Sequence, residues 1–372
     1  YEHCDVLVVG SGPSGLASAL AAAKNGARVI LAEDKPNFGG SLLTDEVTIG
    51  NMSGKEWASD TISQLKSMPN VILKKRSQVF GYYDHNMTVM IERVSDHIEN
   101  PSKYTPRQRL HYIRAGEVIV STGSIERPIS FGNNDRPGIV LASAAKEYMK
   151  VYETLVGKKP IIFTNNDTAY STALEFIKND IEPIIVDTRD SSNGELVKEV
   201  QQKGISIKFN SGIADTKGHL KINSAIIGKL DSSKESFISE ETVECDCICM
   251  SGGWTPTVHL SSQAGNKLKF NDDIDAFAHP HHLAHAHPHH LAHTHPHHLA
   301  NAHPHHLAHA HPHRLSNAHP HHLAHAHPHH LAHAHPHHLA HANPHYLAHA
   351  HPHYLAHAHP HHLPHAHPHH LA

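Results

Sequence analysis

The sequence predicts an α/β fold built from two parallel-sheet units, followed by a repetitive tail. An apolar strand near the N-terminus leads into a glycine-rich turn and an alanine-rich helix. The order of strand, helix and strand returns at residues 159–187. From Ala278 onward one octapeptide, HPHHLAHA, repeats with small changes. Strands that alternate with helices are typical of parallel sheets covered by helices.

Composition divides the 372-residue chain into two unlike parts. Residues 1–277 carry 30 Lys and Arg against 35 Asp and Glu, whereas residues 278–372 hold 41 of the 47 histidines. The net negative charge of the first part argues against nucleic-acid binding. No apolar run of about 18 residues predicts a membrane span, and no leader predicts secretion, so we expect a cytoplasmic protein without membrane contact. The chain starts at Tyr1, almost within a strand, and we expect a fragment of a longer protein.

The first strand runs into GSGPSG, in which Gly10, Gly12 and Gly15 have the spacing G-x-G-x-x-G. A helix at 16–24 and a strand at 27–33 follow. Gly10 permits a tight turn, Gly12 lets the backbone approach a pyrophosphate, and Gly15 lets the helix pack against the strand. The helix N-terminus presents N–H groups and a positive dipole end to that pyrophosphate. This order of elements predicts a Rossmann-type, FAD/NAD(P)-binding domain.

Glu33 ends the second strand, 18 residues after Gly15, where a carboxylate can accept both ribose hydroxyls of an adenosine. The same charge repels a 2′-phosphate, so NAD is predicted over NADP. The glycine pattern serves NAD and FAD alike, and Gly39 with Gly40 lets a loop pass close to the ligand, as in flavoproteins of this plan. NAD is therefore the expected cofactor, and FAD is the alternative.

Between the nucleotide-binding motifs we predict a helix at 55–68 and strands at 71–74, 78–84 and 87–93. His85, in the turn between the last two strands, is either a catalytic or a solvated residue.

A strand at 117–121 ends in Thr122-Gly123, a small loop that we expect to return to the first nucleotide. Gly252-Gly253 resembles the segment of such flavoproteins that brings the chain back to close over the first nucleotide, with Trp254 as either a stacking or a packing aromatic residue.

The second unit consists of a strand at 160–164, a helix at 169–178 and a strand at 183–187. Asp187 stands where a ribose-binding acid would be. The connecting loop has no glycine, and Asp167 within it would repel a pyrophosphate. We therefore expect a Rossmann-like layer that has lost its nucleotide.

Cys245, Cys247 and Cys249 alternate, so on a strand they would share one face. They are interpreted as core residues, because no fourth ligand and no C-x-x-C pair accompanies them. No metal site is predicted.

In the tail, proline recurs every eight residues from Pro280 to Pro368, which opposes a continuous helix. One Leu per repeat buries too little surface to offset chain entropy, so we expect disorder. Paired imidazoles are good ligands for zinc, nickel or copper, and metal binding is one interpretation. The other is a tandem DNA repeat translated past a junction.

Several longer phrases resemble one family: GSGPSGLASAL, FGYYDHN, STGSIERP, NNDRPGIVLASAA, FTNNDTAYSTAL and SGGWTPTVHLSSQ. Over residues 3–277 the chain resembles the nucleotide-binding core of the alpha subunit of heterotetrameric sarcosine oxidase. The resemblance implies a flavoenzyme complex that oxidatively demethylates sarcosine to glycine, with other subunits as partners. It implies NAD on this subunit and the covalent flavin on another. The family's ferredoxin-like and folate-binding regions have no counterpart in this sequence.

The expected organisation has three parts. Residues 1–140 with 245–277 form the FAD/NAD(P)-binding domain, 141–244 an inserted Rossmann-like domain, and 278–372 the disordered repeat. The expected function is that of an oxidoreductase acting on CH–NH groups within a complex, with the catalytic residues unassigned and the chain inactive alone. The alternatives are an FAD-binding, pyridine-nucleotide-dependent oxidoreductase and a histidine-rich metal-binding protein.

Overall fold

The computed structural model describes residues 1–272 and 274–278, and beyond them only the backbone of short strands between 290 and 356. The chain divides into two compact units. The first contains residues 1–264 and 272–276, and the second contains residues 265–271 and 277–372.

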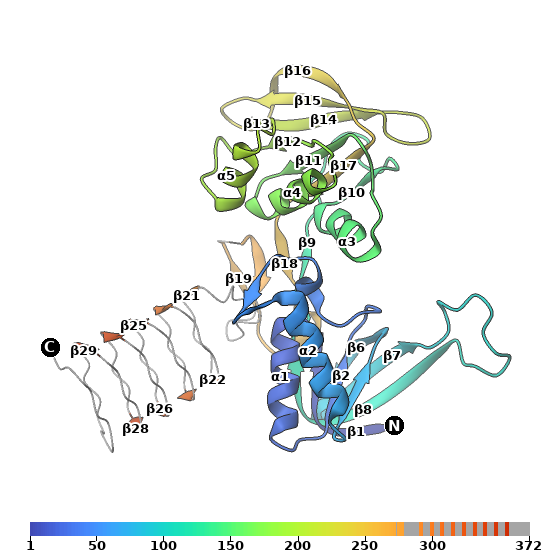
Figure 1. Ribbon diagram of the computed structural model, residues 1–372, viewed down its shortest axis with the longest axis vertical. Coiled ribbons are helices and arrows are strands. Elements are labelled where there is room, and N and C mark those ends of the chain that lie inside the picture. Colours follow the sequence, from blue (N-terminus) through green and yellow to red (C-terminus); the bar gives the residue numbers. More distant parts are fainter. Residues whose placement is uncertain are drawn as a thin grey trace. The chain divides into compact units, whose positions relative to one another are not determined.

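The apolar run near the N-terminus forms a central strand of a six-stranded sheet with the order β5-β2-β1-β8-β7-β6 (Figure 1). The first four of these strands are parallel, and β7 and β6 continue the sheet in antiparallel fashion. The strands are β1 (Glu2–Val9), β2 (Val29–Ala32), β5 (Val71–Lys74), β6 (Ser77–Tyr83), β7 (Met87–Arg93) and β8 (Gln108–Val120). The predicted Rossmann-type sheet is therefore confirmed.

Both faces of this sheet are covered by apolar side chains. Helices α1 (Pro13–Lys24) and α2 (Gly54–Ser67) pack on one face, around Leu16 and Leu65. The alanine-rich surface of α1 permits this close packing, and a capping box between Ser53 and Glu56 begins α2. On the other face, the short helix α6 (His259–Gln263) contributes Leu260 to a cluster that includes residues of β6 and β7.

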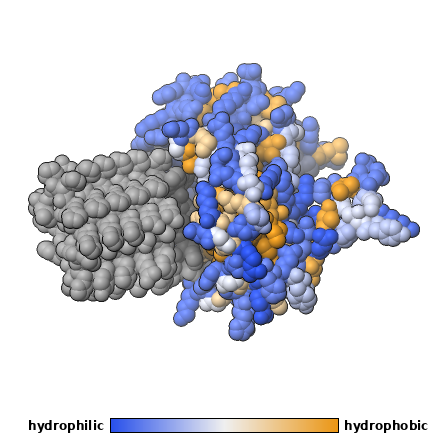
Figure 2. Space-filling model, turned by 60° about the horizontal axis from the view of Figure 1, so that its bottom comes forward, coloured by the Kyte–Doolittle hydropathy of each residue, from blue (hydrophilic) through white to orange (hydrophobic). Residues whose placement is uncertain are grey.

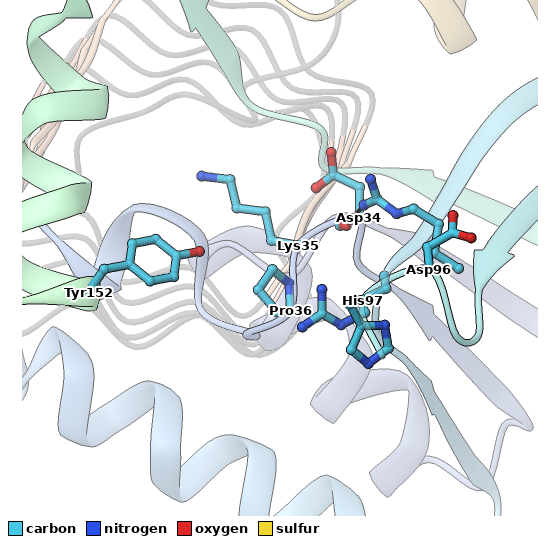
Figure 3. Close-up of a pocket in the computed structure, with 8 residues that line it drawn as sticks. Asp34, Lys35, Pro36, Asp96, His97 and Tyr152 are labelled. Carbon is cyan, nitrogen blue, oxygen red and sulfur yellow. Dashed lines mark hydrogen bonds between the residues drawn. The ribbon is translucent and has the colours of Figure 1, made fainter. Parts of the chain in front are cut away.

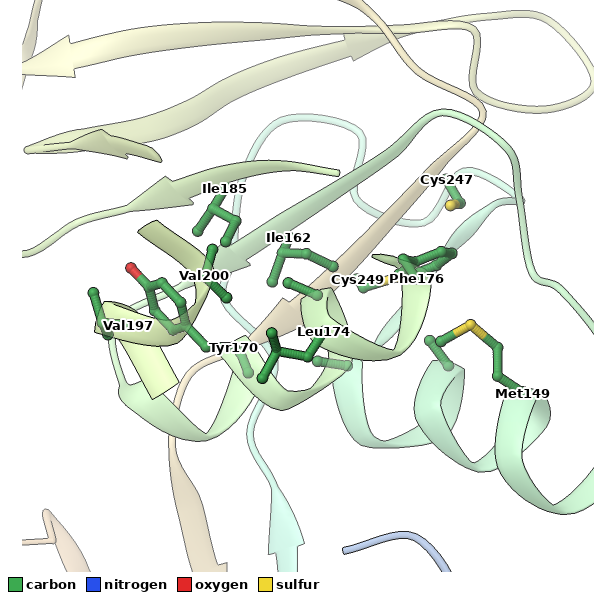
Figure 4. Close-up of a cluster of buried hydrophobic side chains, with 14 residues drawn as sticks. Met149, Ile162, Tyr170, Leu174, Phe176, Ile185, Val197, Val200, Cys247 and Cys249 are labelled. Atoms are coloured by element: carbon green, nitrogen blue, oxygen red, sulfur yellow. The ribbon is translucent and has the colours of Figure 1, made fainter. Parts of the chain in front are cut away.

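The second sheet has five parallel strands in the order β10-β17-β11-β12-β13. Its strands are β10 (Ile139–Leu141), β11 (Pro160–Thr164), β12 (Ile184–Asp187), β13 (Ile207–Phe209) and β17 (Cys247–Ser251). One face packs against helices α3 (Ala142–Tyr152), α4 (Tyr170–Lys178) and α5 (Glu195–Gln202), as Figure 4 shows. The other packs against an antiparallel sheet of β14 (Ser211–Lys217), β15 (Ser224–Leu230) and β16 (Phe237–Glu244).

An antiparallel ribbon of β9 (Ser124–Glu126) and β18 (Trp254–Pro256) marks where the chain leaves the first sheet and returns to it. The remaining short elements outside the tail are η1 (Gly40–Leu43), β3 (Thr48–Ile49), β4 (Met52–Ser53), η2 (Asp84–Asn86), η3 (Asp167–Ala169), β19 (Lys269–Asn271) and β20 (Ala276–Ala278).

The position of β17 corrects the expected domain boundary. This strand pairs with β10 and β11, so it belongs to the second sheet and not to the domain formed by residues 1–140. The chain returns to the first sheet only after β17, through β18 and α6.

The expected common face of the three cysteines is also corrected. Cys247 and Cys249 pack beneath the helices, whereas Cys245 packs toward the antiparallel sheet. Regular pairing of the strand begins only at Cys247, because the chain turns at Asp246. The Asp246 carboxylate accepts the backbone N–H groups of Lys158 and Lys159 at this turn.

Several predicted strands have the same bounds in the structure, including those at 71–74, 87–93 and 160–164. The strand expected at 117–121 is part of the 13-residue β8. Its first half is rich in charged and polar residues because alternate side chains are exposed, and so it lacks the apolar run of a buried strand.

Within the tail, the described strands β21 to β29 contain three residues each, from β21 (His290–Ala292) to β29 (Tyr354–Ala356). They pair in parallel with strands two repeats away, as in His290 with His306. The prediction of disorder is not supported by these strands, and the remaining residues of the repeat lie outside the described ones. Separately, no helix in the described part of the chain is both long and apolar enough to cross a membrane.

Hydrophobic residues interrupt the mostly hydrophilic face shown in Figure 2. The antiparallel part of the first sheet exposes Phe80, Leu110 and Tyr112, and the ring of Tyr1 stacks on that of Tyr112 at 5.2 Å between centroids. Exposed apolar side chains are therefore present on this strand group.

The helix-to-strand contact at Gly15 predicts a strong effect on stability. A Cβ atom at Gly15 would lie 1.9 Å from the carbonyl oxygen of Gly10, so Gly15→Ala must displace backbone. We expect a loss of about 3 kcal/mol in the free energy of unfolding, measured by urea denaturation of the full chain. Gly12→Ala is the control, because no heavy atom lies within 4 Å of its Cβ position, and we expect it to cost less than about 1 kcal/mol. Equal stability of the two variants would contradict the prediction.

Candidate functional site

The glycine turn after β1 is shaped by contacts between backbone atoms. Gly10 has a φ of +96°, and a Cβ there would lie 2.3 Å from the carbonyl oxygen of Ser121, at the end of β8. At Gly15 a Cβ would meet the carbonyl of Gly10, which is the close packing predicted for the third glycine. Gly12, in contrast, faces open space. The three glycines thus lie where a pyrophosphate would approach the N-terminus of α1.

Glu33 directly follows β2 and is buried beside this turn. Its Oε2 accepts hydrogen bonds from the backbone N–H and the hydroxyl of Ser11, and its Oε1 accepts one from the N–H of Lys35 at 2.9 Å. Burial, aided by the neighbouring Asp34 carboxyl, raises the pKa of Glu33, and the donors from Ser11 and Lys35 oppose this. A carboxylate oxygen can accept more than one bond, so Oε1 retains capacity for a ribose hydroxyl.

The loop containing Gly39 and Gly40 lies against the glycine turn, as the sequence predicted. The N–H of Gly39 donates to the carbonyl oxygen of Ser11 at 3.1 Å, and Gly39 has a φ of +128°. A Cβ at Gly40 would lie 2.8 Å from the Cα of Gly12. Only glycine fits both requirements of left-handed backbone and close approach.

Thr122 and Gly123 follow β8 and adjoin the turn, again as predicted. They hold the returning chain, because the Thr122 hydroxyl donates to the carbonyl oxygen of Thr257 at 2.8 Å. The N–H of Thr257 donates in turn to the carbonyl oxygen of Gly123 at 2.9 Å.

Gly252 and Gly253 do not close over the glycine turn, which corrects the expectation. They follow β17 at the second sheet, where the N–H of Gly252 donates to the carbonyl oxygen of Arg127 at 2.7 Å. A Cβ at Gly252 would lie 2.9 Å from the carbonyl oxygen of Pro128. Glycine therefore lets this segment cross close to the backbone of the segment at Arg127 and Pro128. Trp254 is half-buried, and its Nε1–H donates to the Thr168 hydroxyl at 2.9 Å, so it too lies at the second unit.

A pocket of about 360 Å³ is lined by the three residues that follow Glu33 in the chain, Asp34, Lys35 and Pro36 (Figure 3). Its lining residues are Asp34, Lys35, Pro36, Arg76, Arg93, Asp96, His97 and Tyr152. Sequence reasoning missed this pocket. A signal was available for Arg76, which follows β5, the neighbour of β2, at the same carboxyl edge of the sheet. No local signal indicated Tyr152, because it comes from α3 of the second sheet.

The acid at the corresponding position of the second unit is closed off by other side chains. Asp187 is fully buried, and its carboxylate accepts hydrogen bonds from the Tyr170 hydroxyl at 2.8 Å and from Arg189 at 2.7 Å. Arg189 also pairs with Asp167 at 2.7 Å. Burial and the bond to Asp187 raise the pKa of Tyr170, so the phenol stays a donor. The arrangement is an ion-pair network around a buried acid, with Arg189 and Asp167 partly exposed, in the place of a ribose contact.

The remaining groups considered are the candidate metal ligands, the cysteines and His85. No group of three His, Cys, Asp or Glu side chains is placed there to hold a metal ion. Burial raises the pKa of Cys245 to about 12 and that of Cys4 to about 11, which keeps both as unreactive thiols. His85 is exposed in the hairpin turn.

The fold is that of proteins with two dinucleotide-type sheets joined by a crossing ribbon. Residues 4–276 match the family described as pyridine nucleotide-disulphide oxidoreductase, and the chain belongs to that family.

The expected resemblance is confirmed among curated relatives. The sarcosine oxidase subunit alpha of Rhizobium meliloti (strain 1021) is 38% identical over 284 residues, covering 75% of this chain and 27% of the relative. That of Corynebacterium sp. (strain P-1) is 34% identical, covering 74% of this chain and 29% of the relative. The chain thus spans less than a third of the length of these relatives.

Solved structures share the fold. An L-proline dehydrogenase from P. horikoshii has a TM-score of 0.53 at 20% identity, over 76% of this chain and 48% of its own. A thioredoxin reductase from T. acidophilum has a TM-score of 0.54 at 15% identity, over 72% of this chain and 83% of its own.

The network around Asp187 predicts a structural role for this acid. Asp187→Ala would leave the Tyr170 hydroxyl and the Arg189 guanidinium without their buried acceptor, at a cost of about 3 kcal/mol in unfolding free energy. Urea denaturation of the full chain measures the loss. The control is Asp190→Ala, which removes an exposed partner of Lys234 and should cost less than about 1 kcal/mol. An Asp187→Ala variant as stable as the control would contradict this role.

Proposed function

We propose that this chain is the dinucleotide-binding portion of an oxidoreductase subunit and that it binds NAD at its first unit. The observation that carries the proposal is the buried Glu33, which retains acceptor capacity at the end of β2 beside the open backbone at Gly12. The site residues proposed from this geometry are Gly10, Gly12, Gly15, Glu33, Gly39, Gly40, Thr122 and Gly123.

The residues present fit a dinucleotide. Gly12 is the N-cap of α1 without a capping side chain, and the first turn of α1 has no acidic residue. The positive end of the helix dipole is therefore available to a pyrophosphate. Glu33 accepts ribose hydroxyls, and the loop at Gly39 and Gly40 limits the space above the turn. When bound, the nicotinamide or flavin ring would supply the acceptor for a hydride.

Charge favours NAD over NADP. A 2′-phosphate would meet Glu33 and the adjacent Asp34 and would replace a ribose hydroxyl bond by repulsion. Of the nearby cations, Lys35 pairs with Glu147 at 2.6 Å and Arg93 donates to the Asp34 carbonyl oxygen, whereas Arg76 at the same pocket opposes this preference. We expect a net difference of about 1.5–3 kcal/mol, or roughly ten- to a hundredfold in affinity.

FAD is the second candidate cofactor, because the family is one of FAD- and NAD(P)-binding folds and because Gly39-Gly40 has the flavoprotein arrangement. Both dinucleotides share the ADP half that the first unit would hold. Glu33 supports either dinucleotide, and the choice of NAD over FAD rests on the resemblance to the sarcosine oxidase alpha subunit.

We place the chain in a complex with other subunits that acts on CH–NH groups, in line with the curated relatives named as subunits of sarcosine oxidase. The chain alone carries no assigned catalytic base or flavin attachment site, and we propose that it is inactive by itself. The alternative of a histidine-rich metal-binding protein depends on side chains outside the described residues.

The cofactor preference is measured by titration calorimetry of the full chain with NAD, NADP and FAD. We expect NAD to bind ten- to a hundredfold more tightly than NADP, and Glu33→Ala to narrow that ratio. Gly12→Val should abolish the binding of both NAD and NADP, because the valine side chain would fill the space for the pyrophosphate. Glu182→Ala, an exposed acid at the second sheet, is the matched control and should leave the ratio unchanged. Tight FAD binding without NAD binding would overturn the cofactor assignment and retain the ADP site.

Peroxide formation tests the dependence on other subunits. The purified full chain, supplied with NAD or FAD and with sarcosine in air, should produce no hydrogen peroxide in a peroxidase-coupled assay. Glucose oxidase with glucose added to the same sample verifies that peroxide is detected. Sustained peroxide release from sarcosine by the chain alone would contradict the proposal.

A further inference from the structure

The pocket beside Glu33 is walled by residues of both parallel sheets. Lys35 and Arg76 follow strands of the first sheet, whereas Tyr152 is the last residue of α3, which packs on the second. Figure 3 shows the Tyr152 ring directed toward the segment at Lys35 and Pro36 from the opposite wall.

The order of the strands indicates what the pocket would hold. The glycine turn, Glu33 and Arg76 follow β1, β2 and β5, which are neighbours in that order along one carboxyl edge. A dinucleotide with its pyrophosphate on the turn and its ribose on Glu33 must extend its adenine beyond β2, toward Arg76. The volume of about 360 Å³ is ample for a purine.

Ion pairs hold α3 against the loop that follows Glu33. Lys35 pairs with Glu147 at 2.6 Å, and Lys146 pairs with Asp45 at 2.7 Å. Tyr152, two turns along α3 from Lys146, is therefore held at the pocket without a ligand. Tyr152 is 49% exposed, and its ring contacts that of Tyr148 at 5.9 Å between centroids, so the rest of the ring surface is available for stacking.

The pocket carries charges of both signs. Lys35, Arg76 and Arg93 line it together with Asp34 and Asp96, and of these Lys35 pairs with Glu147 and Asp96 with Arg107. A planar base between an aromatic ring and a guanidinium gains from stacking on both sides.

The geometry points to Tyr152 as a base-recognition residue: its ring stacks on the adenine of a dinucleotide bound at the first unit, opposite Arg76. The second sheet, whose own acid Asp187 is closed off, thereby contributes to the nucleotide site of the first. This inference rests on the proposed function and deepens it.

Calorimetry of the full chain with NAD, FAD and ADP-ribose tests the inference, because all three contain adenine. Tyr152→Ala should lower the affinity for each ligand by about tenfold, whereas the affinities of Tyr152→Phe should equal those of the unaltered chain. Tyr83→Ala is the matched control, since Tyr83, the last residue of β6, is 57% exposed and does not line the pocket. Thermal unfolding of each variant in the absence of ligand should remain unchanged.

The outcomes separate this inference from the proposed function. If the unaltered chain binds a dinucleotide and Tyr152→Ala binds it equally well, the role of Tyr152 is overturned and the proposed function stands. An equal loss in Tyr83→Ala would show that the effect is not specific to the pocket and would also overturn it. If the unaltered chain binds none of the three ligands, both are overturned.

Discussion

The first unit depends on one constraint, which is that backbone meets backbone where β1 turns into α1. The positions of a Cβ at Gly10 and Gly15 lie 2.3 Å and 1.9 Å from the carbonyl oxygens of Ser121 and Gly10, respectively. Because these positions have no side chains, β1, α1 and the end of β8 can pack closely around the turn between β1 and α1. The loop at Gly39 and Gly40 then packs on the same turn, and Glu33 is fixed by Ser11 within it.

Two acids, Glu33 and Asp187, stand at matching strand ends but lie in different environments. Glu33 accepts donors mostly from backbone and hydroxyl groups, and a pocket adjoins it. Asp187 is enclosed by Arg189 and Tyr170, so its acceptor capacity is used inside the protein. A carboxylate that is already neutralised has little to gain from a ribose, and the second sheet therefore acts as a scaffold.

Two sets of contacts hold the second sheet to the first. Thr122 and Gly123 hold the returning strand at Thr257, and lysines of α3 pair with acids of the loop after Glu33. These contacts bring Tyr152 to the pocket, so a residue far from the glycine turn in sequence adjoins the proposed adenosine position.

The sequence by itself determined the fold of the first unit, because the sequence signals for that unit are local. Glycine spacing, the alanine-rich helix and the acid at a strand end report backbone conformation and packing over about 30 residues. The tertiary structure decided the features that depend on distant segments. The sheet to which β17 belongs, the place of Gly252 and Gly253, the face of Cys245 and the approach of Tyr152 follow from how the chain crosses between sheets, and no local pattern records that crossing.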